Sequence, residues 1–124
     1  MITMEDPILI VDDEALISLG LQMMLNQMGY KNCFTARTVD ESVLKADKYR
    51  PKLILMDYRL KGGTTGIEAT NIIRQTHHCP VIFITGSNET ETRSKIFEAR
   101  PSGLLIKPIL PKDLRQAIND LECM

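Results

Sequence analysis

Short apolar runs alternate with segments of helical spacing along the chain, and this alternation limits the possible folds more than any other feature of the sequence. The apolar runs occupy residues 7–11, 31–36, 52–56, 81–84 and 104–106. The segments with helical spacing occupy residues 14–28, 38–49, 66–75, 90–99 and 111–121. The pattern therefore predicts five strands and five helices in strict alternation.

Residue types at the helix ends support this division. Gly29 is suited to stop the first helix. Thr38, with Glu41 three residues later, forms a capping box, and Pro111 suits a first helical turn. Strands that are apolar on both faces belong in a parallel sheet with helices on both sides. We therefore expect an α/β, doubly wound, flavodoxin-like (βα)5 fold, with residues 1–124 forming a single domain.

Composition excludes several other classes of protein. The net charge is −1, from 15 basic and 16 acidic residues. The chain therefore lacks the basic excess that would indicate nucleic-acid binding. The apolar runs are too short to span a membrane, and residues 1–7 carry no secretory signal pattern. Cys33, Cys79 and Cys123 form no CxxC pair, so neither a zinc site nor a redox motif is indicated. We expect a cytoplasmic protein with reduced thiols.

The polar residues that follow the predicted strands carry the functional information. The first strand is followed by Asp12 and Asp13, and the third by Asp57. Thr85 ends the fourth strand, and Lys107 follows the fifth. Because the carboxyl ends of parallel strands share one edge of the sheet, these five side chains can converge there.

Three converging carboxylates need a cation. At about 5 Å and an effective dielectric constant near 20, each pair of carboxylates repels by about 3 kcal/mol. Hard oxygen ligands favour Mg²⁺, and a carboxylate can act as a nucleophile towards phosphorus. Lys107 supplies positive charge, Thr85 a hydroxyl donor, and Gly86 free space and a backbone N–H. Singly, each residue has an ordinary alternative as a turn cap or a solvated side chain; their joint occurrence favours a phosphoryl-transfer site.

With these residues in this order, the sequence resembles the receiver domain of two-component response regulators. The resemblance runs from about residue 8 to residue 121. The matching motifs are Ile10-Val11-Asp12-Asp13-Glu14, Leu55-Met56-Asp57, Gly66-Ile67-Glu68, Ile84-Thr85-Gly86 and Lys107-Pro108.

The resemblance implies a Mg²⁺-dependent phosphorylation site. Asp57 would be the phosphoacceptor, receiving the group from a phosphohistidine on a sensor histidine kinase. Asp13 and Asp57 would bind Mg²⁺ directly and Asp12 through water, and the backbone carbonyl of Arg59 would complete the protein ligands. Such a module catalyses only its own phosphoryl transfer and dephosphorylation, so we expect no further enzyme activity.

The resemblance also implies a switch. Lys107 would pair with Asp57 and then with the phosphoryl oxygens, and Thr85 would swing towards the phosphoryl group. The Lys107-Pro108 bond would be cis. The family usually places an aromatic residue three positions before the lysine; Leu104 stands there, which predicts a different readout of the switch.

One loop length departs from the family pattern, and two further positions vary within the family. The segment from Asp57 to Gly66 is one residue longer than the commonest spacing. Arg59 and Ser87 occupy positions that tune dephosphorylation in the family.

The first predicted helix is apolar on more than one side. One stripe has the spacing of a core face: Ile17, Leu21, Met24 and Met28. A second stripe consists of Leu16, Leu19 and Met23, and one sheet face need not cover it. The second stripe is either an extension of the core face or a docking surface for a sensor histidine kinase or a histidine phosphotransfer protein.

Three alternatives remain open from the sequence. An aspartate-nucleophile phosphatase also uses a strand-end Asp but carries a second acid two residues on, where this chain has Arg59. A phosphate-independent binding module is disfavoured by the intact acids and Lys107, whereas Leu104 is compatible with it. The chain is also either a stand-alone receiver or a piece of a larger regulator.

Overall fold

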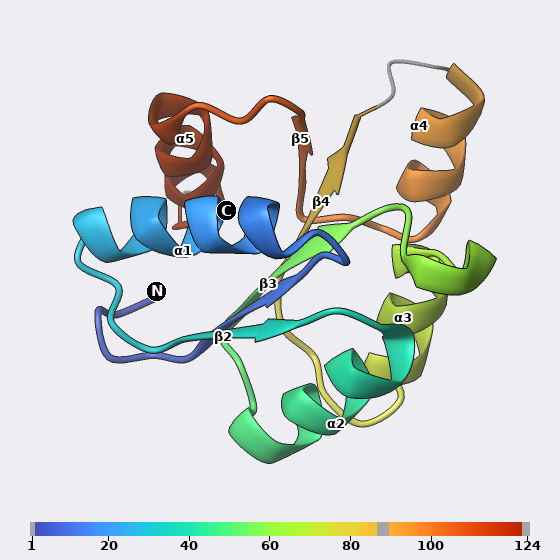
Figure 1. Ribbon diagram of the computed structural model, residues 1–124, viewed down its shortest axis with the longest axis horizontal. Coiled ribbons are helices and arrows are strands. Elements are labelled where there is room, and N and C mark those ends of the chain that lie inside the picture. Colours follow the sequence, from blue (N-terminus) through green and yellow to red (C-terminus); the bar gives the residue numbers. More distant parts are fainter. Residues whose placement is uncertain (1, 87–89, 123–124) are drawn as a thin grey trace.

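The computed structural model describes residues 2–86 and 90–122, so Ser87 and Cys123 lie outside the described residues. The described residues contain a parallel sheet with helices on both faces (Figure 1). The strands are β1 (Ile8–Val11), β2 (Cys33–Ala36), β3 (Leu53–Asp57), β4 (Val81–Thr85) and β5 (Gly103–Ile106). The helices are α1 (Ala15–Gln27), α2 (Val39–Tyr49), α3 (Gly66–Ile73), α4 (Thr90–Glu98) and α5 (Pro111–Glu122). The predicted alternation of strands and helices is confirmed.

The strand order is β2-β1-β3-β4-β5, and every neighbouring pair is parallel. The chain moves outwards from β1 to β2 and then crosses back to β3, so the order reverses between β1 and β3. In doubly wound sheets, ligands bind at such a reversal, beyond the carboxyl ends of the strands. Val11 lies opposite Met56, which brings the following residues, Asp12 and Asp57, to the same level at that edge.

The core has two halves, one on each face of the sheet, because successive strand residues point to opposite faces. Helices α1 and α5 cover one face, and α2, α3 and α4 cover the other (Figure 1). The first half contains the strand residues Ile8, Ile10, Leu53, Leu55, Ile82 and Ile84. The second contains Leu9, Val11, Ile54, Met56, Val81 and Phe83. Double-sided burial explains why the strands read as continuous apolar runs.

Several element ends differ from the predictions by one or two residues. Strand β3 includes Asp57, which the apolar pattern excluded, because its backbone pairs with Ile84 in the sheet. Strand β2 begins at Cys33 rather than at residue 31. Gly29 follows the end of α1 with a φ of 100°, a left-handed conformation that favours glycine.

The loop between β3 and α3 contains a short 3-10 helix, η1 (Lys61–Gly63), which the sequence pattern did not predict. An antiparallel bridge between Arg59 and Thr65 closes the loop at its base. Gly62 and Gly63 have φ values of 79° and 77°, so this turn needs residues without a side chain. The long β3–α3 connection therefore has a defined turn.

Within residues 2–86 and 90–122, no helix has the length and apolar character needed to cross a membrane.

Candidate functional site

A pocket of about 430 Å³ lies at the carboxyl edge of the sheet, where the strand order reverses. Its lining comes from the last residues of β3 and β4 and from the segments that follow β1, β3, β4 and β5. It is lined by Asp13, Glu14, Asp57, Arg59, Thr85, Gly86 and Lys107. The structure therefore brings together most of the residues that the strand ends predicted.

Three carboxylates converge beside this pocket. Asp12, Asp13 and Asp57 each offer an oxygen atom, and these atoms all lie within 4.8 Å of one another. Asp12 is 0% exposed and Asp57 4% exposed, whereas Asp13 is half-buried. The Oδ1 atom of Asp12 accepts a hydrogen bond of 2.9 Å from the backbone N–H of Glu14, which fixes the turn after β1.

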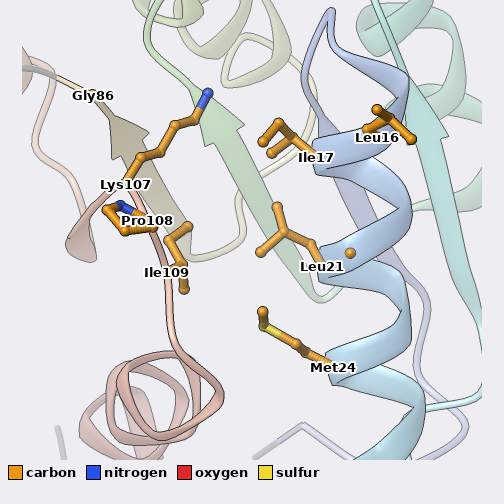
Figure 2. A pocket seen from close by; sticks show the side chains of 9 residues that line it. Leu16, Ile17, Leu21, Met24, Gly86, Lys107, Pro108 and Ile109 are labelled. Atoms are coloured by element: carbon orange, nitrogen blue, oxygen red, sulfur yellow. The ribbon is translucent and has the colours of Figure 1, made fainter.

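Lys107 lies between two of these carboxylates. Its Nζ atom is 3.3 Å from Oδ2 of Asp12 and 3.4 Å from Oδ1 of Asp57. Its backbone N–H donates to the carbonyl of Thr85 over 2.8 Å, which ties the lysine to the end of β4. The Lys107-Pro108 peptide bond is cis, as the family resemblance implied. In Figure 2 the amino group of Lys107 extends away from Pro108 and Ile109.

Burial raises the pKa of two carboxylates of this site, Asp57 and Asp12. Burial raises the pKa of Asp57 to about 7, the charge of Asp12 adds to the effect, and Lys107 opposes it. Burial also raises the pKa of Asp12, against the hydrogen bond from Glu14 and the charge of Lys107. Burial lowers the pKa of Lys107, but the Asp57 and Asp12 carboxylates outweigh it, so the net shift is upward. The ammonium ion is therefore the more stable form of Lys107 in the folded protein.

One oxygen atom of the cluster is left without a hydrogen bond. Oδ2 of Asp12 is buried and lies near the Lys107 ammonium, yet it has no hydrogen-bond partner among the described residues. The ion pair with Lys107 offsets part of the cost of burying this oxygen, and a metal cation or a water molecule would satisfy it further. Three carboxylates within 4.8 Å of one another, one with an unsatisfied oxygen, fit a hard divalent cation such as Mg²⁺.

The remaining predicted residues occupy different surroundings. Thr85 ends β4, is buried and lines the pocket. Gly86 also lines it, and a Cβ atom built there would meet no atom within 4 Å. The Arg59 guanidinium lies 5.7 Å from the centre of the Tyr58 ring. Leu104 lies in β5, partly buried against the core half that α2, α3 and α4 cover.

Gly66 supports the backbone of Asp57, a role that the sequence analysis did not assign. A Cβ atom on Gly66 would lie 2.3 Å from the Asp57 carbonyl oxygen and 2.6 Å from Cγ of Met56. Its N–H donates to the carbonyl of Tyr58 over 2.7 Å. The sequence signal was present as a glycine directly after the N-cap residue Thr65, at the start of α3.

The second stripe of α1 is exposed. Leu16, Leu19 and Met23 are 83%, 52% and 53% exposed, whereas the first stripe packs in the core. The interpretation of the second stripe as an extended core face is therefore wrong. Beside this helix lies an apolar groove of about 410 Å³, bordered by Pro108 and Ile109 across from α1 (Figure 2).

Comparison with known proteins identifies relatives along nearly the whole chain. The family model described as response regulator receiver domain matches residues 8–119. The chain is 34% identical over 117 residues to the phyllosphere-induced regulator PhyR of Methylorubrum extorquens, covering 94% of this chain and 43% of PhyR. It is 36% identical over 112 residues to the transcriptional regulatory protein ResD of Bacillus subtilis, covering 90% of this chain and 46% of ResD. The chain thus spans about half the length of these relatives.

Solved structures give the same result. The signal receiver domain of a modulated diguanylate cyclase from Desulfovibrio desulfuricans G20 matches with a TM-score of 0.83 and 30% identity, covering 93% of this chain and 91% of that one. The anti-anti-sigma factor PhyR from Bartonella quintana matches with a TM-score of 0.80 and 30% identity, covering 96% of this chain and 48% of that one. The flavodoxin-like fold predicted from the sequence is confirmed.

Proposed function

The chain belongs to the response regulator receiver domain family of two-component signalling, and we propose that it is phosphorylated on Asp57 in a Mg²⁺-dependent reaction. One observation carries the proposal. The Asp57 carboxylate lies buried at the switch point of the sheet, within 3.4 Å of the Lys107 ammonium and within 4.8 Å of two further carboxylates. The donor would be a phosphohistidine on a sensor histidine kinase or a histidine phosphotransfer protein.

The site residues would have two different roles in phosphoryl transfer, as the nucleophile and as the metal ligands. An oxygen of Asp57 attacks the phosphorus while the P–N bond to the donor imidazole breaks, and the leaving imidazole keeps the electron pair of that bond. Asp12, Asp13, Asp57 and the carbonyl of Arg59 would hold Mg²⁺. When bound, Mg²⁺ neutralises charge on the phosphoryl oxygens.

Lys107 keeps Asp57 reactive. The carboxylate must be ionised to attack, yet burial raises its pKa to about 7. The ammonium, 3.4 Å away, favours the ionised form and then faces the oxygens of the arriving phosphoryl group. Thr85, buried at the end of β4, would donate its hydroxyl to the same group.

A switch follows from the change in charge at the pocket. Phosphorylation adds negative charge beside Thr85 and Lys107, and this shifts the population between two conformations. Leu104 lies where the family resemblance implies an aromatic residue, and it packs with the core on the α4 side. We propose that β5 and α4 report the switch through this aliphatic packing instead of an aromatic ring.

The exposed stripe of α1 suits the phosphodonor. Leu16, Leu19 and Met23 lie on the helix that borders the groove beside Lys107. Such a combination of exposed apolar side chains and a groove fits the helical bundle of a kinase or phosphotransfer protein. The relatives differ in output by name, as an anti-anti-sigma factor and as a transcriptional regulator. We propose that residues 1–124 form one cytoplasmic domain that signals by protein contact, without binding nucleic acid or membrane.

The phosphatase alternative has little support at this site. The position that would carry its second acid is Arg59, whose side chain lies against the Tyr58 ring. A guanidinium does not release a proton at physiological pH, so it cannot act there as a general acid.

Acetyl phosphate tests the proposal without any knowledge of the natural donor. We expect the intact mass of the protein to increase by one phosphoryl group with acetyl phosphate and Mg²⁺, and not with EDTA. Asp57→Asn should abolish the increase, whereas Asp47→Asn, in an exposed acid of α2, should leave it unchanged. A phosphoryl adduct that persists in Asp57→Asn would refute the assignment.

A further inference from the structure

We propose that Arg37 is a positioning residue for the metal site, holding the backbone of Asp13 so that its carboxylate faces the bound cation. This inference rests on the proposed function, because it assigns Arg37 a role in the Mg²⁺ site inferred from the three carboxylates. It adds the residue that directly follows β2, the strand on the far side of β1 from Asp57.

The guanidinium of Arg37 contacts the turn that carries Asp13. Its Nη2 atom donates a hydrogen bond of 3.2 Å to the backbone carbonyl of Asp13. Among the described residues, no carboxylate lies within the 4.0 Å of this guanidinium that an ion pair requires. The side chain therefore directs a full positive charge at a backbone dipole rather than at an acid.

A hydrogen bond of the sheet holds the same turn at Asp12, the residue before Asp13. The backbone N–H of Asp12 donates to the carbonyl of Ala36 over 3.0 Å. The last residue of β2, Ala36, and the residue after it, Arg37, thus contact two consecutive acids, Asp12 and Asp13. With the bond from the N–H of Glu14 to Asp12, the turn is fixed from both sides.

The start of α2 fixes Arg37 itself. The backbone N–H of Arg37 donates to Oε1 of Glu41 over 2.6 Å, and the N–H of Glu41 donates to Oγ1 of Thr38 over 3.1 Å. The predicted capping box is therefore present in a shifted form, because Glu41 receives the N–H of the residue before the N-cap. The helix cap thus fixes the backbone from which Arg37 extends.

A positioning role and a purely electrostatic role of Arg37 predict opposite changes in Mg²⁺ affinity. A guanidinium near a cation site repels the cation, so removing its charge alone would tighten Mg²⁺ binding. Removing a group that orients a ligand weakens binding, commonly tenfold or more. The sign of the change in Mg²⁺ affinity therefore separates the two roles.

The test compares Arg37→Gln with Arg50→Gln. The glutamine side chain is shorter and neutral, so it cannot reproduce the bond to Asp13. Arg50 is also exposed, and its Nη2 atom also donates to a backbone carbonyl over 3.2 Å, that of Thr76. It precedes β3 at the opposite edge of the sheet and, unlike Arg37, forms an exposed ion pair of 3.8 Å with Asp47. Mg²⁺ affinity is measured by calorimetry, and the rate of acetyl phosphate labelling is measured over a range of Mg²⁺ concentrations.

We expect Arg37→Gln to raise the dissociation constant of Mg²⁺ and the half-saturating Mg²⁺ concentration by about tenfold. The labelling rate at saturating Mg²⁺ and the melting temperature in EDTA should stay near those of Arg50→Gln, because the contact is exposed and its loss leaves the core intact. Unchanged or tighter Mg²⁺ binding in Arg37→Gln would overturn the role of Arg37 alone. An unaltered chain that binds no Mg²⁺ would overturn the proposed function as well.

Discussion

The protonation state of Asp57 is set by its surroundings. A carboxyl group with a pKa of about 7 is half protonated at neutral pH, so the metal-free pocket holds a weakened nucleophile. Any cation that enters the pocket favours the ionised form. The same residue is therefore a source of instability in the metal-free protein and the centre of the proposed reaction.

This instability predicts a pH dependence with a defined sign. The folded state binds the Asp57 proton more tightly than the unfolded state, whose pKa is near 3.8, so stability falls as the pH rises from about 4 to about 7. Above about pH 7 both states have lost the proton, and this contribution stays constant. At about pH 8 in EDTA, Asp57→Asn should exceed the unaltered chain in free energy of unfolding by about 4 kcal/mol.

Urea unfolding of both proteins between about pH 4 and about pH 8 measures the effect as a difference, which cancels the contributions of titrating groups that do not interact with Asp57. The advantage of Asp57→Asn should shrink towards the acidic end and disappear near the pKa of the unfolded state. An advantage independent of pH would mean that the Asp57 pKa is not raised in the folded protein.

Individual site residues were predictable from the sequence to different degrees. Asp57 and Lys107 could be placed together because each stands at the carboxyl end of an apolar run, and parallel strands end at a common edge. Arg37 could not be placed, since its contact with Asp13 spans 24 residues and depends on the path of a long side chain. Strand-end chemistry can be inferred from hydrophobic periodicity, whereas side-chain contacts across elements cannot.

At the scale of elements, the close approach of α3 to the end of β3 supports the pocket. Gly66, the first residue of α3, lies so close to the Asp57 carbonyl that a methyl group would not fit between them. A glycine at this point allows the helix to start directly over the strand end. The position of the phosphoacceptor backbone thus depends on the packing of two elements.

Gly66→Ala should therefore lower stability and slow phosphorylation. Because the clashing atoms belong to the backbone and to a buried Met56, relief needs a backbone shift, and we expect a loss of about 2 kcal/mol in free energy of unfolding. Denaturant unfolding and the rate of acetyl phosphate labelling measure the two effects.

Gly20→Ala is the matched control, because a Cβ atom on Gly20 in α1 would meet no atom within 4 Å. Alanine is favoured over glycine inside a helix, so this variant should be more stable by about 0.5–1 kcal/mol and be labelled at the normal rate. Equal effects of the two substitutions would show that the contact with Asp57 is unimportant.

For the whole molecule, the fold was predictable because a complete αβ alternation with double-sided apolar strands allows few topologies. The observed strand order, with its reversal between β1 and β3, is that of the doubly wound, flavodoxin-like sheet that the alternation predicted. The exact strand ends and the turn η1 were not predictable from periodicity. Asp57 is polar although it pairs within the sheet, and η1 depends on the left-handed Gly62 and Gly63.

The exposed stripe of α1 should matter for phosphorylation by a kinase but not for phosphorylation by acetyl phosphate. A combined substitution of Leu16, Leu19 and Met23 by serine should reduce phosphotransfer from autophosphorylated histidine kinases at least tenfold, because it removes the exposed apolar contact area. Acetyl phosphate needs no docking, so its labelling rate should not change.

Serine substitution of Leu44, an exposed leucine of α2, serves as the control and should affect neither reaction. Normal kinase-driven transfer in the triple variant would place the docking surface elsewhere.

The most direct test of the central claim is chemical trapping of the phosphorylated residue. An acyl phosphate is reduced by borohydride to an alcohol, so phosphorylated Asp57 would become homoserine, and peptide mass spectrometry would locate it. We predict homoserine at position 57 after treatment with acetyl phosphate and Mg²⁺, and none after treatment in EDTA. Homoserine at position 12 or 13, or a phosphoryl group that survives reduction on a serine or threonine, would contradict the assignment of Asp57 as the phosphoacceptor.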